Sequence, residues 1–231
     1  DESQLISAAE NASIETSYIL DGDITLTHCV TVKTGHWLIL DLNGKVINRG
    51  LSSGSASDDG CVFHVEEESV LELQNSGSDR GGITGGYATY GGGIYNEGGI
   101  FVHGGKIYGN KAQYKGGGIY NIGSISIDGG SISDNNAEEM GGGIWNGGTL
   151  YVHGSVQVSG NHRGTANNNI FLPDGKYITM TGILADDASI YVSTEKISAK
   201  VTSGYSQYPY STELIKPDAD RVIVKENGEV Y

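Results

Sequence analysis

Two histidines and an aspartate recur with a spacing of 25 residues, at His103, Asp128 and His153. If they occupy one position on successive turns of a repeating fold, neighbouring side chains lie about 5 Å apart and the two histidines about 10 Å apart. Imidazole and carboxylate groups suit zinc, but the ligands of one zinc ion converge within about 4 Å of each other. We therefore favour an exposed polar column with His–Asp contacts over a metal site, and we expect no cofactor.

Three aromatic residues share the same spacing: Tyr95, Tyr120 and Trp145. The alternation of apolar and polar residues around them points them outward, so their rings should form one column. Such a column can stack on sugar faces or pack into a protein partner, and Phe101 and Tyr151 on the adjacent strand face should flank it. Two alternatives stay open. A long loop, residues 50–60 or 203–212, covers the column, or the rings stack only on one another.

Catalytic motifs are missing from the sequence. A polysaccharide-cleaving site on a repetitive β fold needs aspartates with histidine and arginine, or a basic residue beside calcium-binding carboxylates. The adjacent pair Asp186–Asp187 has neither His nor an Arg-x-Lys motif near it, and no nucleophile elbow, phosphate loop, CxxC or HExxH pattern occurs. We predict no catalytic residue and lean against an enzyme.

Composition limits the partners that this chain can have. The 231 residues carry 14 basic and 28 acidic side chains, for a formal charge of −14. Nucleic-acid binding needs clustered lysine and arginine, so we expect no nucleic-acid partner. No apolar run approaches the about 20 residues of a membrane-spanning helix, so we expect no membrane span.

The two cysteines, Cys29 and Cys61, lie 32 residues apart, about one turn of a repeating fold. Stacked inward positions on neighbouring turns could hold a disulfide or two buried thiols. We favour buried thiols, because proteins that depend on a disulfide framework use more cysteines.

The elements that must position these residues come from a repeat. Three segments begin alike, with GGGIYN at Gly91, GGGIYN at Gly116 and GGGIWN at Gly141. A fixed period of this length is typical of a solenoid. We therefore predict an all-β, single-stranded, right-handed parallel β-helix with three short strands per turn of about 25 residues and about eight or nine turns. Gly117 and Gly142 should sit at matched corners that demand a positive φ or a close backbone approach.

The register of the repeats predicts two kinds of inward column. Isoleucines and a valine should stack along the axis in two rows: Ile94, Ile119 and Ile144, then Ile107, Ile132 and Val158. Asparagines should form two further columns, bonded from turn to turn through their amides: Asn96, Asn121 and Asn146, then Asn110, Asn135 and Asn161. The segments 111–115 and 136–140 are expected to be loops that leave the same corner.

We expect residues 1–231 to form one domain with a cap at each end. A helix over residues 3–12, capped by Ser3, should cover the first turn. The chain divides into an N-terminal cap (1–17), helix turns (18–200) with the clean repeats (91–161), and a C-terminal cap (201–231) that ends in a hairpin at Asn227–Gly228.

The repeats GGGIYN…GGxIxxN, the opening ILDGDITL…LDLNGKVI and the closing ANNNIFLPDGKYITMTGIL resemble the β-helix modules of large cell-surface proteins in Gram-positive gut bacteria. These modules are similar in fold to pectate lyases. The repeats also resemble the GGA(I/L/V) and FxxN repeats of chlamydial polymorphic outer-membrane adhesins, with a third glycine in place of alanine. The resemblance covers most of residues 18–231.

This resemblance implies a secreted, bacterial cell-surface module, adhesin-like or a structural stalk, within a larger multidomain protein. A glycan or a host-surface protein would be its partner. The rival hypothesis is a carbohydrate-active enzyme, a polysaccharide lyase or glycoside hydrolase, because the pectate-lyase-like fold also hosts these activities.

Overall fold

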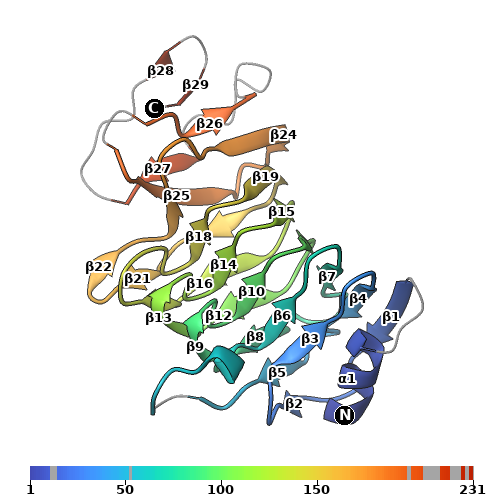
Figure 1. The fold of residues 1–231 in the computed structure, drawn as a ribbon. Helices are drawn as coiled ribbons and strands as arrows, with labels where there is room; N and C mark the ends of the chain where they lie inside the picture. The colour runs from blue at the N-terminus through green and yellow to red at the C-terminus, as the bar shows by residue number, and fades with distance from the viewer. Residues whose placement is uncertain are drawn as a thin grey trace.

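The computed structural model describes residues 1–10, 15–51, 54–196, 199–204 and 214–218, and the backbone of 225–226 and 229–230. The chain forms a right-handed parallel β-helix of eight turns, with the N-terminus at one end of the solenoid and the last strands at the other (Figure 1). The predicted fold class is confirmed.

Each face of the solenoid is a parallel sheet with one strand from each turn. Face 1 has eight strands, β1 (Glu15–Ile19), β4 (Trp37–Asp41), β7 (Val70–Gln74), β11 (Gly99–Val102), β15 (Ser124–Ile127), β19 (Thr149–Gly154), β24 (Ile178–Leu184) and β26 (Thr202–Ser203). Face 2 contains β2 (Ile24–Thr25), β5 (Val46–Asn48), β8 (Gly82–Thr84), β12 (Lys106–Tyr108), β16 (Ser131–Ser133), β20 (Gln157–Val158), β25 (Ser189–Thr194) and β27 (Ile215–Pro217). Face 3 contains β3 (Val30–Val32), β6 (Phe63–Val65), β10 (Ile94–Asn96), β14 (Ile119–Asn121), β18 (Ile144–Asn146) and β23 (Ile170–Leu172). Faces 2 and 3 join at β25, which pairs with both β20 and β23.

A fourth face adds to the three expected strands per turn. It contains β9 (Tyr87–Tyr90), β13 (Lys111–Lys115), β17 (Asn136–Ala137), β21 (His162–Arg163) and β22 (Ala166–Asn167). The prediction of a corner loop was therefore wrong for 111–115 and for the first two residues of 136–140, whose other three residues belong to no named strand. Ala112 and Ala137 are buried and pair with each other, so this segment contributes small inward residues that a search for bulky apolar alternation overlooks. The antiparallel pair β21–β22 ends the face.

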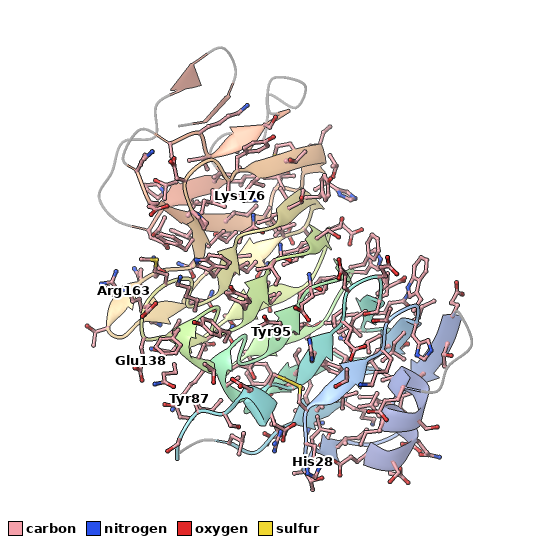
Figure 2. All side chains as sticks on the ribbon, in the orientation of Figure 1. His28, Tyr87, Tyr95, Glu138, Arg163 and Lys176 are labelled. Carbon is pink, nitrogen blue, oxygen red and sulfur yellow. A yellow bond between two sulfur atoms is a disulfide. The ribbon has the colours of Figure 1, made fainter. Side chains whose placement is uncertain are left out.

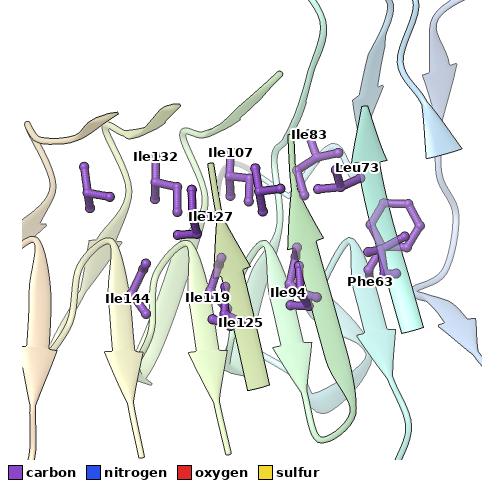
Figure 3. Packing of buried hydrophobic residues seen from close by; sticks show 14 of the residues in the cluster. Phe63, Leu73, Ile83, Ile94, Ile107, Ile119, Ile125, Ile127, Ile132 and Ile144 are labelled. Carbon is purple, nitrogen blue, oxygen red and sulfur yellow. The ribbon is translucent and has the colours of Figure 1, made fainter. Parts of the chain in front are cut away.

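The core consists of apolar side chains stacked along the axis, as Figure 3 shows. Ile94, Ile119 and Ile144 align on face 3 and are fully buried. The row on face 2, Ile107, Ile132 and Val158, aligns in the same way. Both predicted rows are confirmed, and each fully buried side chain contributes about 1.5–3 kcal/mol of transfer free energy.

Both asparagine columns are confirmed as buried ladders. On face 3, the Asn96 amide donates to Asn121 Oδ1 at 2.7 Å, and the Asn121 amide donates to Asn146 Oδ1 at 2.6 Å. At the corner before face 4, the Asn110 amide donates to Asn135, and the Asn135 amide donates to Asn161. The first ladder steps by 25 residues throughout, whereas the second steps by 25 and then 26.

Replacing Asn121 with alanine should destabilise the fold by about 1–3 kcal/mol, because the change leaves Asn146 Oδ1 buried without its donor and removes one of the acceptors of the Asn96 amide. Asn146→Ala is the matched control: its side chain ends the ladder, where its Nδ2 already lacks a hydrogen-bond partner. Denaturant melts should therefore show a larger loss for Asn121→Ala than for Asn146→Ala. Equal midpoints for Asn121→Ala and the parent would contradict the ladder.

The first turn is covered by helix α1 (Glu2–Glu10), which buries Leu5 and Ala9 against the core. The expected helix is thus present. Its cap is Asp1, since Gln4 donates its backbone N–H to the Asp1 carboxylate at 3.0 Å, and not Ser3. Residues 11 and 12 of the predicted span lie outside the described residues. No helix among the described residues is long and apolar enough to cross a membrane.

The C-terminal end carries the expected hairpin strands, β28 (Lys225–Glu226) and β29 (Glu229–Val230), which pair antiparallel. Their connecting residues 227–228 lie outside the described residues. Parallel pairing also continues past residue 200, through β26 on face 1 and β27 on face 2.

Cys29 and Cys61 form a disulfide, so the prediction of buried thiols was wrong. The reason lies in the register of β3 and β6, which pairs Val30 with Phe63 and brings the two cysteines ahead of these strands to a Cα–Cα distance of 5.2 Å. Two cysteines on adjacent turns meet the geometric requirement by themselves. A larger cysteine framework is not needed. A short 3-10 turn, η1 (Asp58–Gly60), leads into Cys61.

Candidate functional site

The three rings of the predicted aromatic column, Tyr95, Tyr120 and Trp145, sit at the centre of β10, β14 and β18 and are Cα partners across face 3. They point outward, because the flanking isoleucines and asparagines of each strand are buried. Tyr95 and Tyr120 stack with ring centroids 5.2 Å apart, and Tyr120 and Trp145 stack at 4.7 Å with planes only 7° apart. The structure brings these three predicted residues together.

A second row of side chains lies over the aromatic column. Tyr90, at the end of β9, packs on Tyr120 at 5.0 Å and on Tyr114 at 5.3 Å. Lys115, at the end of β13, holds its ammonium 5.1 Å from the centre of the Trp145 ring. Tyr90 and Lys115 are register partners, so each covers the ring of the following turn.

Stacking and covering leave the aromatic column half-buried. Both faces of the Tyr120 ring are closed by its neighbours, and Tyr95 meets the edge of His64 at 5.2 Å. Burial raises the pKa of the Tyr120 hydroxyl, and burial together with the negative charge of Glu97 raises the pKa of the Tyr95 hydroxyl. The neighbouring rings thus occupy both faces of Tyr120, so a sugar cannot stack on the faces of the central ring.

Phe101 and Tyr151 lie on face 1, not on the face of the aromatic column. Phe101 stacks on Trp37 at 6.2 Å and on His103 at 6.1 Å. Ser126 separates Phe101 from Tyr151 in the register of β11, β15 and β19. Tyr151 is 37% exposed. Both residues thus lie on the adjacent strand face, as expected, and the ring contacts of Phe101 are with Trp37 and His103.

A hollow of about 360 Å³ lies beside Tyr95, at the N-terminal end of the aromatic column. In Figure 2 the labelled Tyr95 lies on the face above the disulfide, whose Cys61 also borders this hollow. Its lining combines two tyrosine rings with acidic and histidine side chains: Asp58, Cys61, His64, Tyr90, Tyr95 and Glu97. His64 Nε2 lies 2.9 Å from Glu97 Oε2.

The segment 50–60 was one of two loops that could have covered the aromatic column. In the structure, η1 of this segment borders the hollow beside Tyr95. Tyr120 is covered by Tyr90, and Trp145 is covered by Lys115. The other segment, 203–212, lies outside the described residues from 205 onward.

His103, Asp128 and His153 form a linear ladder on the outside of the solenoid. His103 Nδ1 lies 2.8 Å from Asp128, while His153 Nε2 lies 3.6 Å from the same carboxylate. Glu72 extends the ladder, 3.6 Å from His103 Nε2. No group of three or more His, Cys, Asp or Glu side chains in the described part of the chain is placed to hold a metal ion. The arrangement is an exposed polar column with His–Asp contacts.

Sequence reasoning missed Tyr90, Lys115, His64 and Glu97. Tyr90 and Lys115 could have been found from their position in the repeat, since each stands directly before a GGG triplet. Comparisons with family models, with curated proteins and with solved structures found no match for this chain.

Proposed function

We propose that this chain is a non-enzymatic module of a bacterial cell-surface protein, an adhesin-like rod that presents the rim of the aromatic column to a protein partner. The resemblance of its repeats to surface β-helix modules supports this proposal. The disulfide supports a secreted protein, since such bonds persist in oxidising compartments.

The observation that carries the proposal is the stack of Tyr95, Tyr120 and Trp145. Both faces of the central Tyr120 ring are closed by contacts within the chain, which makes a rigid ridge and disfavours a glycan that would stack on this ring. The rims remain available to the side chains of a protein, and tyrosine and tryptophan are frequent anchors of protein interfaces. The charge of −14 favours a partner with a basic surface.

The proposal is tested with the double variant Tyr120→Ala/Trp145→Ala against an array of purified extracellular proteins, mucin and neutral glycans. We expect a protein ligand whose affinity falls at least about tenfold in this variant, as interface aromatic residues contribute about 2 kcal/mol or more. Phe101→Ala/Tyr151→Ala is the matched control, because it removes two aromatic rings from the other face. Folding of both variants is checked by circular dichroism.

Three outcomes would overturn the proposal. If the column variant binds its ligand with unchanged affinity, the aromatic column is not the binding surface. If the protein binds only a neutral glycan, the partner is a glycan and not a protein. Release of reducing sugars or of unsaturated products from mixed polysaccharides would establish the rival hypothesis, a polysaccharide-degrading enzyme.

A further inference from the structure

Tyr95 differs from the other two rings of the aromatic column because its recorded ring contacts, with Tyr120 and His64, include none with the row that contains Tyr90 and Lys115. Tyr90 covers Tyr120, and the Lys115 ammonium covers Trp145. The equivalent segment one turn earlier contains η1: Ser57, directly before η1, pairs with Ala88, and Tyr90 follows two residues after Ala88. Tyr95 therefore borders open space of about 360 Å³ where its neighbours meet a side chain.

The side chain that could have filled this space points elsewhere. Asp59 of η1 accepts a hydrogen bond from the Cys29 backbone N–H at 3.0 Å and pairs with Arg49 at 3.2 Å. Arg49 is largely buried and also donates to the Leu26 and Asp59 carbonyls. These contacts engage the Asp59 side chain with Cys29 and Arg49, so the hollow beside Tyr95 is a built feature of this corner.

The chain itself shows what such a corner accepts. Two turns along, the occupant of the equivalent space is an alkylammonium group, that of Lys115, placed against an aromatic ring at a cation–π distance of 5.1 Å. In the hollow the aromatic surface is supplied by Tyr90 and Tyr95. The space that Lys115 occupies and the hollow are thus alike: each lies at the same corner of the solenoid and is bordered by aromatic rings.

Negative charge at the hollow favours a cation. Glu97 and Asp58 both line it, and the Asp58 carboxylate has no ion-pair partner among the residues that the structure describes. The remaining titratable group is His64, which lies against Glu97. Two carboxylates and two tyrosine rings match the charge and the apolar stem of an aliphatic amine.

We propose that this hollow binds an alkylammonium group, supplied by a lysine side chain of a protein partner. The assignment of the amine to a protein rests on the proposed function, whereas the binding of an amine in the hollow does not. A lysine bound in the hollow would add a charged contact at the N-terminal end of the aromatic column to the proposed protein interface.

The test is a nuclear magnetic resonance titration of the whole chain with N-acetyl-lysine amide, with the neutral N-acetyl-norleucine amide as the matched probe. We expect the lysine probe to shift the backbone amides of Glu97 and Gly98 and the norleucine probe to leave them in place. Asp58→Asn/Glu97→Gln should weaken binding at least about fivefold. Tyr95→Leu should weaken it by a similar factor, since the leucine keeps bulk but loses the ring.

Asp186→Asn is the control for lost negative charge, since this exposed residue lies in the turn between β24 and β25, far along the solenoid from the hollow. Equal shifts with both probes, or unchanged binding in both hollow variants, would overturn the inference even where the protein partner of the aromatic column is found. Tighter binding of glucosamine than of the lysine probe would overturn the assignment to lysine. If the lysine probe binds but no protein in the array does, the proposed function fails while the binding of an amine in the hollow stands.

Discussion

Replacing Gly117 with valine should unfold the middle of the solenoid or cost more than about 3 kcal/mol of stability. A Cβ at this position would lie 2.4 Å from the backbone oxygens of both Asn136 and Gly142. These oxygens belong to the next turn and cannot move without breaking the parallel pairing. The preceding residue, Gly116, has the positive φ of +69°, so close approach rather than backbone conformation is the constraint at Gly117.

The matched control is Gly22→Val, because a Cβ at Gly22 meets no heavy atom within 4 Å. Gly142→Val should behave like Gly117→Val, since its Cβ would lie 2.1 Å from the His162 carbonyl oxygen. Circular dichroism and denaturant melts report the effect. If Gly117→Val expresses and melts at the midpoint of Gly22→Val, the packing of successive turns at this corner is looser than described.

Removal of the disulfide by Cys29→Ala/Cys61→Ala should lower the free energy of unfolding by about 4 kcal/mol, as expected for a cross-link that closes a loop of about 32 residues. The loss arises mainly in the unfolded chain, which gains conformational freedom when the cross-link is absent. The first turns should then open before the rest, because α1 and the disulfide together hold this end of the solenoid.

Reduction of the parent protein provides the control for the alanine side chains. Treatment with dithiothreitol should shift the melt of the parent toward that of the double variant and leave the variant unchanged. A reduced parent that melts at the midpoint of the oxidised form would show that the cross-link contributes nothing to stability.

Most of the fold could be predicted because each structural position of a turn occurs three times in the sequence, once in each repeat. Ile94 and Asn96 illustrate this. Their recurrence at 25-residue intervals fixes both the period and the inward direction, and alternation then places Tyr95 outside. The disulfide was not predicted, because the number of cysteines was weighed more heavily than their positions on adjacent turns.

The candidate site was harder to predict than the fold, for two physical reasons. The residues that cover the aromatic column are Tyr90 and Lys115, which share a position but not a chemical type, so no repeated residue marks them. The register of β13 against β9 also shifts between Ala112 and Lys115, which breaks simple counting. The hollow beside Tyr95 depends in addition on where the Asp59 side chain turns, and side-chain direction in a 3-10 turn leaves no periodic signal.

The unequal steps of the two asparagine ladders bear on how such chains change length during evolution. Ile127 pairs with Val152 at an offset of 25 residues, and Ile132 pairs with Val158 at an offset of 26. One residue has therefore been inserted at the corner between faces 1 and 2, where neither ladder runs. Face 4 accommodates a second single-residue change, since Lys111 pairs with Tyr87 at an offset of 24 residues and Lys115 pairs with Tyr90 at an offset of 25. Gene duplication and deletion should consequently preserve whole turns, while changes of a single codon fall at the corner between faces 1 and 2 and on face 4.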